Sequence, residues 1–124
     1  MVACKKSSNT TPTTSITGKW YETKIVLQQT KNGATPVTET TNITDKSSYV
    51  VFNSNGTGTT TEDGQTSNFT YSLSGSSLAL TPNTDNATYT VQSLTNTGFV
   101  LHEVFSYQQG NDTISSSIDD YFNK

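Results

Sequence analysis

The feature that most constrains this chain is a series of short β-type runs separated by residues that favour tight turns. About eight such runs are recognised: 16–29, 48–53, 57–62, 67–73, 77–81, 87–95, 98–108 and 113–122. The connections are rich in Asn, Asp, Gly and Ser, which suit the backbone conformations of hairpin turns. Consecutive hairpins predict an all-β, up-and-down meander, and a meander of about eight strands closes most readily into a single antiparallel β-barrel. The long polar stretch 31–47, with Asn32, Gly33 and Pro36 as breakers, is expected to be a loop.

Alternation along the runs indicates which side chains face the barrel interior. In 67–73, Phe69 and Tyr71 share one face and Thr70 shares the other with Ser72. The first run has no clean apolar face, and a β-bulge could change its parity partway. In 98–108 the apolar face contains an acid among its members, which are Phe99, Leu101, Glu103, Phe105 and Tyr107.

Composition limits the possible partners. The 124 residues suffice for one domain, and 30% hydrophobic residues allow only a thin core. Arginine is absent and the formal net charge is −3, so a nucleic-acid partner is not expected. No apolar run approaches the roughly 20 residues of a membrane-spanning helix. The single cysteine excludes an intramolecular disulfide.

That cysteine, Cys4, lies near the N-terminus and is followed by Lys5, Lys6 and a Ser/Thr/Asn tract. The run Val2-Ala3-Cys4 resembles the end of a bacterial lipobox, in which the cysteine takes a lipid anchor. Residues 1–15 are therefore expected to be a lipidated N-terminus and flexible tether, and residues 16–124 the barrel domain. The alternative is an ordinary exposed thiol, because a signal peptide needs about 7–15 apolar residues before its cleavage site and only three residues precede Cys4.

A family resemblance rests on several residues taken together. Gly18-Lys19-Trp20 resembles the G-x-W of lipocalins, and later segments are similar to bacterial lipocalin-like domains of Gram-negative envelope lipoproteins. Those segments are 49–57, 71–75, 78–80, 89–95 and 100–101. The resemblance implies a ligand-binding barrel on an outer-membrane lipoprotein, periplasmic or surface-exposed. Lipocalins also place an arginine over the tryptophan, and here the only cationic candidate near the C-terminus is Lys124.

The residues that carry catalysis or bind metals do not form a recognisable pattern. The only histidine, His102, lies mid-strand and faces away from the apolar row. Asp119-Asp120 is interpreted as a solvated charge pair. No catalytic triad, metal-ligand spacing or phosphate loop is found, so the sequence predicts no enzyme, cofactor or metal.

Glu103 is the one acid expected to have a special role, because Leu101 and Phe105 flank it on its own face. Glu22 or Lys24 could partner it, or it could lie at the barrel mouth in contact with water. The aromatic residues could line a cavity or fill the barrel, and the short chain favours filling. The candidate ligand-binding residues are Trp20, Phe52, Phe69, Tyr71, Tyr89, Leu101, Glu103 and Phe105.

The sequence therefore predicts non-catalytic binding of a small, partly apolar molecule in the barrel. The alternative function is a filled-barrel structural or interaction module that engages another envelope component or a glycan. A cavity with convergent polar groups favours the first function, and a fully packed interior favours the second.

Overall fold

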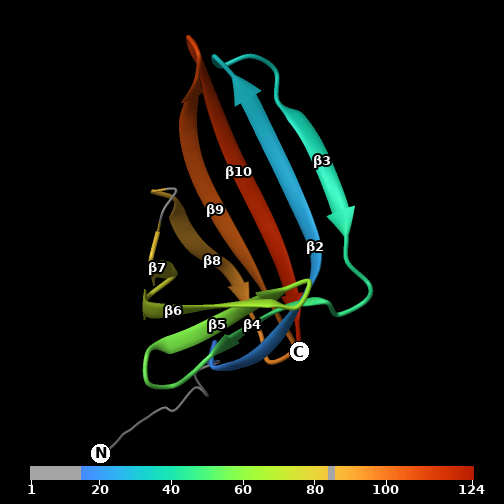
Figure 1. Cartoon of the computed structure of the whole chain (residues 1–124), viewed down its shortest axis with the longest axis vertical. Coiled ribbons are helices and arrows are strands. Elements are labelled where there is room, and N and C mark those ends of the chain that lie inside the picture. The colour runs from blue at the N-terminus through green and yellow to red at the C-terminus, as the bar shows by residue number, and fades with distance from the viewer. Residues whose placement is uncertain (1–14, 84–85) are drawn as a thin grey trace, which may run out of the picture.

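The computed structural model describes residues 15–83 and 86–124, which form nine strands and no helix. The strands are β2 (Gly18–Lys31), β3 (Val37–Asn42), β4 (Ser48–Phe52), β5 (Thr57–Glu62), β6 (Gln65–Ser74), β7 (Ser77–Thr81), β8 (Thr88–Leu94), β9 (Gly98–Gln109) and β10 (Asp112–Asn123). Eight of them, β2 and β4 to β10, close into an antiparallel barrel, which confirms the predicted fold class (Figure 1). In the described residues, no helix is long and apolar enough to cross a membrane.

The barrel closes through β10 and β2. Their ladder runs from the pair Ile114 and Lys31 to the pair Asn123 and Tyr21, almost the full length of both strands. The pairing of β7 with β8 is much shorter and involves only two residue pairs. The first and last strands of the domain therefore form its most extensive seam, together with the long β9–β10 hairpin.

A β-bulge interrupts β2 at Thr23. Tyr121 of β10 pairs with Lys24 and the next residue, Phe122, pairs with Glu22, so Thr23 is an extra residue on β2. Before the bulge, Trp20 and Glu22 face inward and are buried. After the bulge the odd-numbered residues Ile25 and Leu27 face inward, because they pair with Asp120 and Ile118 of β10. This is the change of parity that a bulge in the first run was expected to cause.

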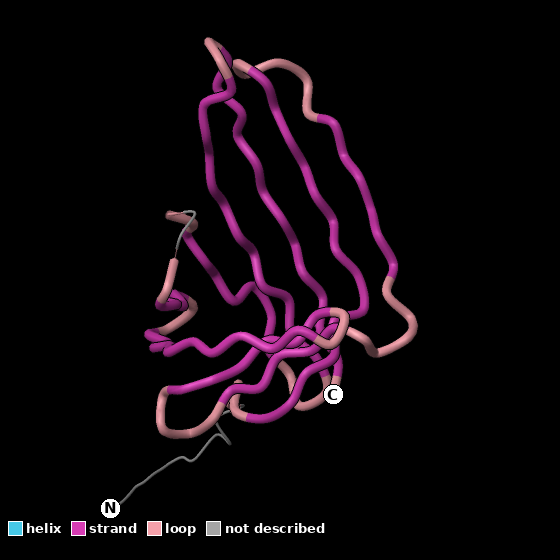
Figure 2. The backbone as a smooth tube through the Cα atoms, viewed as in Figure 1, coloured by secondary structure: helices cyan, strands magenta, loops and turns pink. Residues whose placement is uncertain are grey.

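The strand β3 was not predicted. The expectation of a loop throughout 31–47 is wrong, because Val37–Asn42 pairs with the second half of β2. All six residues of β3 are exposed, so the segment carries no alternation of apolar and polar residues. Its Thr and Val residues nevertheless suit an extended backbone. Together with β2, β9 and β10, β3 forms a four-stranded extension that rises beyond the rest of the barrel (Figures 1 and 2).

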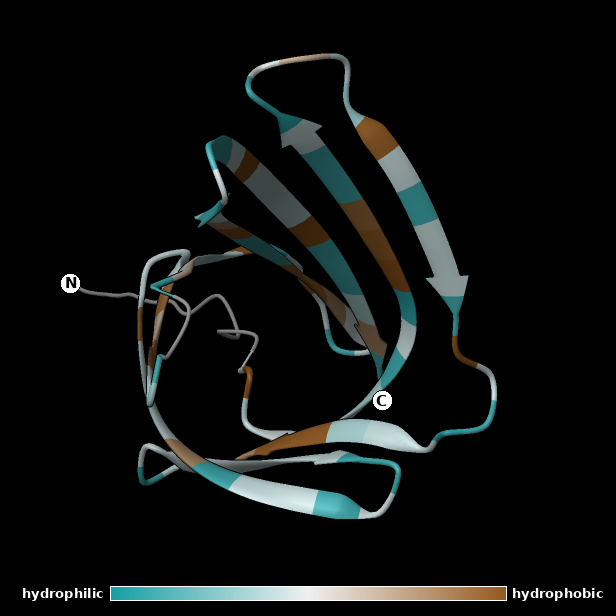
Figure 3. Cartoon of the chain, turned by 45° about the horizontal axis from the view of Figure 1, so that its top comes forward, coloured by the Kyte–Doolittle hydropathy of each residue, from teal (hydrophilic) through white to brown (hydrophobic). Residues whose placement is uncertain are grey.

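The core occupies one end of the barrel, around the fully buried Trp20. The Trp20 ring meets the edge of Phe99 at a centroid distance of 4.9 Å, and Phe99 stacks on Phe122 at 4.5 Å. The indole Nε1 donates a hydrogen bond of 2.7 Å to the carbonyl of Ile16, so its one polar atom is satisfied. Figure 3 shows hydrophobic positions alternating with more polar ones along the strands, as a barrel with one apolar face requires.

Lys124 covers the outside of this core. Its Nζ lies 4.4 Å from the centre of the Trp20 ring, in the place where the lipocalin resemblance implies an arginine. Gly18 allows this approach, because a Cβ built on it would lie 2.5 Å from Lys124 Nζ. Gly18 also has a φ of +130°, a conformation that other residues rarely adopt. The glycine and the tryptophan of the motif thus serve the same contact.

We expect Trp20→Ala to lower the free energy of unfolding by about 3–5 kcal/mol, because it removes the largest fully buried side chain. Urea denaturation measures this loss. Val37→Ala is the control, since Val37 is 71% exposed and its truncation is expected to change stability by less than about 0.5 kcal/mol. Equal effects of the two substitutions would show that Trp20 is not the centre of the core.

Candidate functional site

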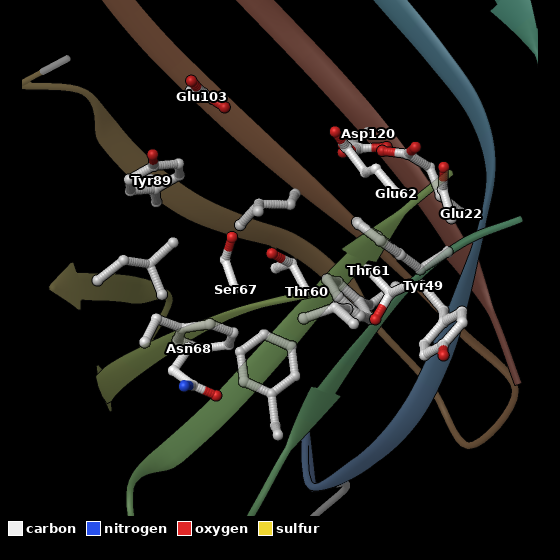
Figure 4. A pocket seen from close by; sticks show the side chains of 18 of the residues that line it. Glu22, Tyr49, Thr60, Thr61, Glu62, Ser67, Asn68, Tyr89, Glu103 and Asp120 are labelled. Atoms are coloured by element: carbon white, nitrogen blue, oxygen red, sulfur yellow. The ribbon is translucent and has the colours of Figure 1, made fainter. Parts of the chain in front are cut away.

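A cavity of about 370 Å³ lies within the barrel, next to the aromatic core (Figure 4). All eight barrel strands contribute to its lining. Its apolar wall is formed by Val50, Phe52, Phe69, Leu80, Pro82, Tyr89, Phe99, Leu101 and Phe122. The volume falls within the range of about 300–1,000 Å³ that is usual for small-molecule sites. The aromatic residues therefore do not fill the barrel completely, contrary to the interpretation that the short chain favoured.

Five of the eight candidate ligand-binding residues line this cavity: Phe52, Phe69, Tyr89, Leu101 and Glu103. The other three are not part of its lining. Trp20 lies in the core, and the Tyr71 hydroxyl donates a 2.7 Å hydrogen bond to the carbonyl of Asn53. Phe105 stacks on Tyr107 along β9, with a centroid distance of 6.4 Å. Contact of any of the eight with a ligand stays a prediction.

Four carboxyl groups also line the cavity, and they come from four different strands. They are Glu22 of β2, Glu62 of β5, Glu103 of β9 and Asp120 of β10. Figure 4 shows Glu22, Glu62 and Asp120 gathered at one side, with Glu103 farther along the wall on β9. Glu22 is only 7% exposed, whereas Glu62 is exposed at the rim, so the acids extend from the interior to the surface.

Asp120 has the most perturbed electrostatic environment of this group. Burial raises its pKa to about 10, assisted by a hydrogen bond with Glu22 and by the negative charges of Glu22, Glu103 and Glu62. Its Oδ1 atom is buried and has no hydrogen-bond partner among the described residues. At neutral pH the Asp120 carboxyl is therefore protonated, which relieves the repulsion between it and Glu22.

The Thr23 bulge brings the two acids together. Glu22 pairs with Phe122, and Asp120 lies two residues earlier on the same face of β10. The prediction that Asp119 and Asp120 form a solvated pair is wrong for Asp120, whose Oδ1 is buried. Glu22 was predicted only as a possible partner of Glu103. The signal was available in the alternation of 113–122, where Asp120 shares the face of Ile118 and Phe122.

None of the lysines among residues 15–83 and 86–124 lines the cavity. Lys24, expected as a possible partner of Glu103, instead lies on the outer face with its Nζ 4.2 Å from the centre of the Tyr121 ring. Lys19 lies over the Tyr49 ring, and Lys31 forms an ion pair with Asp112. Lys46 lies over the Tyr21 ring, and Lys124 lies over the Trp20 ring. The carboxyl groups of the cavity therefore have no lysine as a neighbour on its wall.

His102 faces away from the cavity, as its parity predicted. Its Nδ1 lies 2.6 Å from Oδ1 of Asp119 on the outer surface. In the part of the chain that the structure describes, no three His, Cys, Asp or Glu residues are grouped in a way that could hold a metal ion. Cys4, the expected lipidation site, lies outside the described residues.

The sequence of residues 16–101 matches the family model of the lipocalin-like domain. This match covers more than half of the 124 residues. The chain belongs to the lipocalin-like domain family. No curated protein and no solved structure gives a significant match. The family match ends at residue 101 within β9, so most of β9, all of β10 with Asp120, and Lys124 after β10 lie beyond it.

The raised pKa of Asp120 gives this lipocalin-like domain a testable pH dependence. Its value in the unfolded chain is close to the ordinary 3.8, so the folded state binds the additional proton between pH 4 and 10. Stability should therefore fall as the pH rises, with a slope approaching about 1.4 kcal/mol per pH unit. Urea denaturation between pH 7.5 and 9.5 measures it.

Asp120→Asn should remove most of this slope and stabilise the protein at pH 9, because the amide stays neutral. Asp119→Asn is the matched control, since its side chain lies on the outer face of the same strand. The control should retain the slope. A wild-type stability that is constant or rises over this pH interval would contradict the assignment.

Proposed function

We propose that this lipocalin-like domain binds a small, partly apolar molecule inside its barrel and that its role is not catalytic. The observation that carries the proposal is the 370 Å³ cavity, whose wall combines aromatic rings with a few convergent carboxyl groups. The rings can supply affinity through apolar burial, and the polar groups can fix the orientation of the ligand. The family membership supports the proposal, because the lipocalin-like fold is generally a binding fold.

The arrangement of the side chains supports binding rather than acyl transfer or hydrolysis. The histidine that such a mechanism would use as a base, His102, pairs with Asp119 on the outer face. The hydroxyl groups on the cavity wall, such as those of Thr60 and Ser67, therefore have no imidazole beside them.

A second function, an interaction module, is favoured by one observation. The strand β3 pairs with β2 on one side, and none of the other described strands pairs with its second edge. Such an edge can accept a strand from a partner. All of its residues are exposed, and Val37 is 71% exposed.

A fluorescence titration with a neutral naphthalene-type probe tests the binding proposal. We expect saturable binding to the native protein, and we expect Thr60→Phe to weaken it at least tenfold by filling the cavity. Thr59→Phe is the control, because alternation along β5 places the neighbouring side chain on the opposite face. Absence of saturable binding by any probe would reject the proposal and favour the interaction module.

We further propose that the domain is anchored to the outer membrane of a bacterial envelope through a lipid on Cys4. The support is the sequence Val2-Ala3-Cys4, with two lysines and a polar tract after it. Each buried methylene of an acyl chain contributes about 0.8 kcal/mol to membrane binding. The precursor expressed in its host should therefore incorporate labelled fatty acid and partition into detergent, whereas Cys4→Ser should stay in the aqueous phase. Equal aqueous recovery of both forms would reject the anchor.

A further inference from the structure

We propose that the molecule bound in the barrel is an organic cation, with its ammonium group at Glu22 and Asp120 and its apolar body against the aromatic wall. The inference rests on the proposed function, since it specifies the chemical class of the ligand in the same cavity. It follows from the charge and the hydrogen bonding of the acid pair and from the apolar lining beside it.

The charge of the cavity is the first argument. Its lining contains four carboxyl groups and none of the described lysines, and the chain has no arginine. The carboxyl groups of Glu22 and Asp120 are the buried ones, and a buried carboxylate is costly unless it is paired or neutralised. The lysines that could have supplied a counter-charge lie over aromatic rings: Lys19 over Tyr49, Lys24 over Tyr121 and Lys124 over Trp20. An anionic ligand would add a further negative charge beside the carboxyl groups, whereas a cation would supply the counter-charge.

Hydrogen bonding is the second argument. Glu22 is more than nine-tenths buried, and the buried Oδ1 of Asp120 has no hydrogen-bond partner among residues 15–83 and 86–124. A buried acceptor without a hydrogen bond destabilises the folded state, because it has lost its contact with water. An ammonium group carries up to three N–H donors and no acceptor, so it can satisfy carboxylate oxygens from two strands at once.

The lining beside the acids is the third argument, and it separates an organic cation from a metal ion. The rings of Phe52, Phe69, Phe99 and Phe122 provide contact area and no ligand atoms for a metal. Within the described residues the acids do not form a group with metal-binding geometry. A molecule with a cationic head and an apolar body matches both halves of the cavity.

The proton on the acid pair gives the proposal a specific signature. With the cavity empty, the raised pKa of Asp120 keeps one proton on its carboxyl at neutral pH. When the cation binds, this O–H bond breaks, the proton passes to the solvent and the N–H donors of the ammonium take its place. Affinity for the cation should therefore rise with pH, by up to tenfold per unit, while the amine itself stays charged below about pH 9.

The experiment compares two probes that share one naphthalene-type fluorophore, one ending in a primary ammonium and the other in a neutral methyl group. Fluorescence titration of the unmodified protein at pH 6.5, 7.5 and 8.5 gives both dissociation constants. At pH 8.5 we expect the ammonium probe to bind at least tenfold more tightly than the neutral probe. The ratio of the two dissociation constants should grow from pH 6.5 to pH 8.5. Calorimetry in two buffers of different ionisation enthalpy should show release of close to one proton per ammonium probe bound.

Two variants locate the effect. Glu22→Gln combined with Asp120→Asn keeps the shape of the acid pair and removes its charge, so the preference for the ammonium probe should fall to within about threefold of unity. Asp119→Asn removes a carboxylate from the outer face of the same strand and should leave the preference unchanged.

The outcomes separate this inference from the proposed function. Equal binding of the two probes, or a preference that does not change with pH, would overturn the cation assignment and leave ligand binding in the barrel intact. Failure of both probes to bind would overturn both. A preference that survives the double substitution would place the cation elsewhere and would also overturn the assignment.

Discussion

The β-bulge at Thr23 is the constraint on which both the core and the cavity depend. It lies where β2 changes its neighbour from β4 to β3, and the amide of Ile43, just after β3, donates to the Thr23 carbonyl at 2.8 Å. If Thr23 paired as a regular strand residue and did not bulge, the side chains beyond it would exchange faces, and Ile25 would point outward. The bulge thus keeps Trp20 in the core and Glu22 beside Asp120, while the rest of β2 continues along β10. The one extra residue thus allows β2 to pair with β10 along almost its whole length while its side chains face both the core around Trp20 and the cavity.

Those two interiors have opposite physical character. Around Trp20 the rings of Phe52, Phe99 and Phe122 are packed against each other, and the indole N–H is satisfied by a backbone carbonyl. This packing supplies the stability of a chain with few hydrophobic residues. A short distance away the same strands present carboxyl groups to a cavity, which lowers stability. The packed end fixes the geometry of the strands, and so it also holds the acids in place.

The sequence predicts the parts of this structure that leave a periodic signal. Alternation and turn residues give the barrel and the inward face of β9, and they place His102 outside. Gly18-Lys19-Trp20 and the single C-terminal lysine indicate the contact that closes the core. The strand β3 leaves no such signal, because it is exposed on both faces and only its pairing with β2 shows that it exists.

The environment of Asp120 could not be predicted from its own strand. Alternation along 113–122 places it on the apolar face, but its environment depends on Glu22, Glu62 and Glu103, which come from three other strands. Their proximity follows from the register in which β2 pairs with β10 and from the bulge at Thr23, and no residue pattern in the sequence fixes either of them.

The energetics of the acid cluster bear on the function that we propose for the cavity. Asp120→Asn would keep the size of the side chain and leave it neutral at every pH, whereas the Asp120 carboxyl has to take up a proton on folding because burial raises its pKa to about 10. Proteins retain destabilising groups chiefly where a site uses them, at the expense of stability. The cluster also lines the cavity of about 370 Å³, whereas the aromatic residues around Trp20 pack closely. Cavity and charge therefore coincide in space, and the cation that we propose as the ligand would fill the first and neutralise the second.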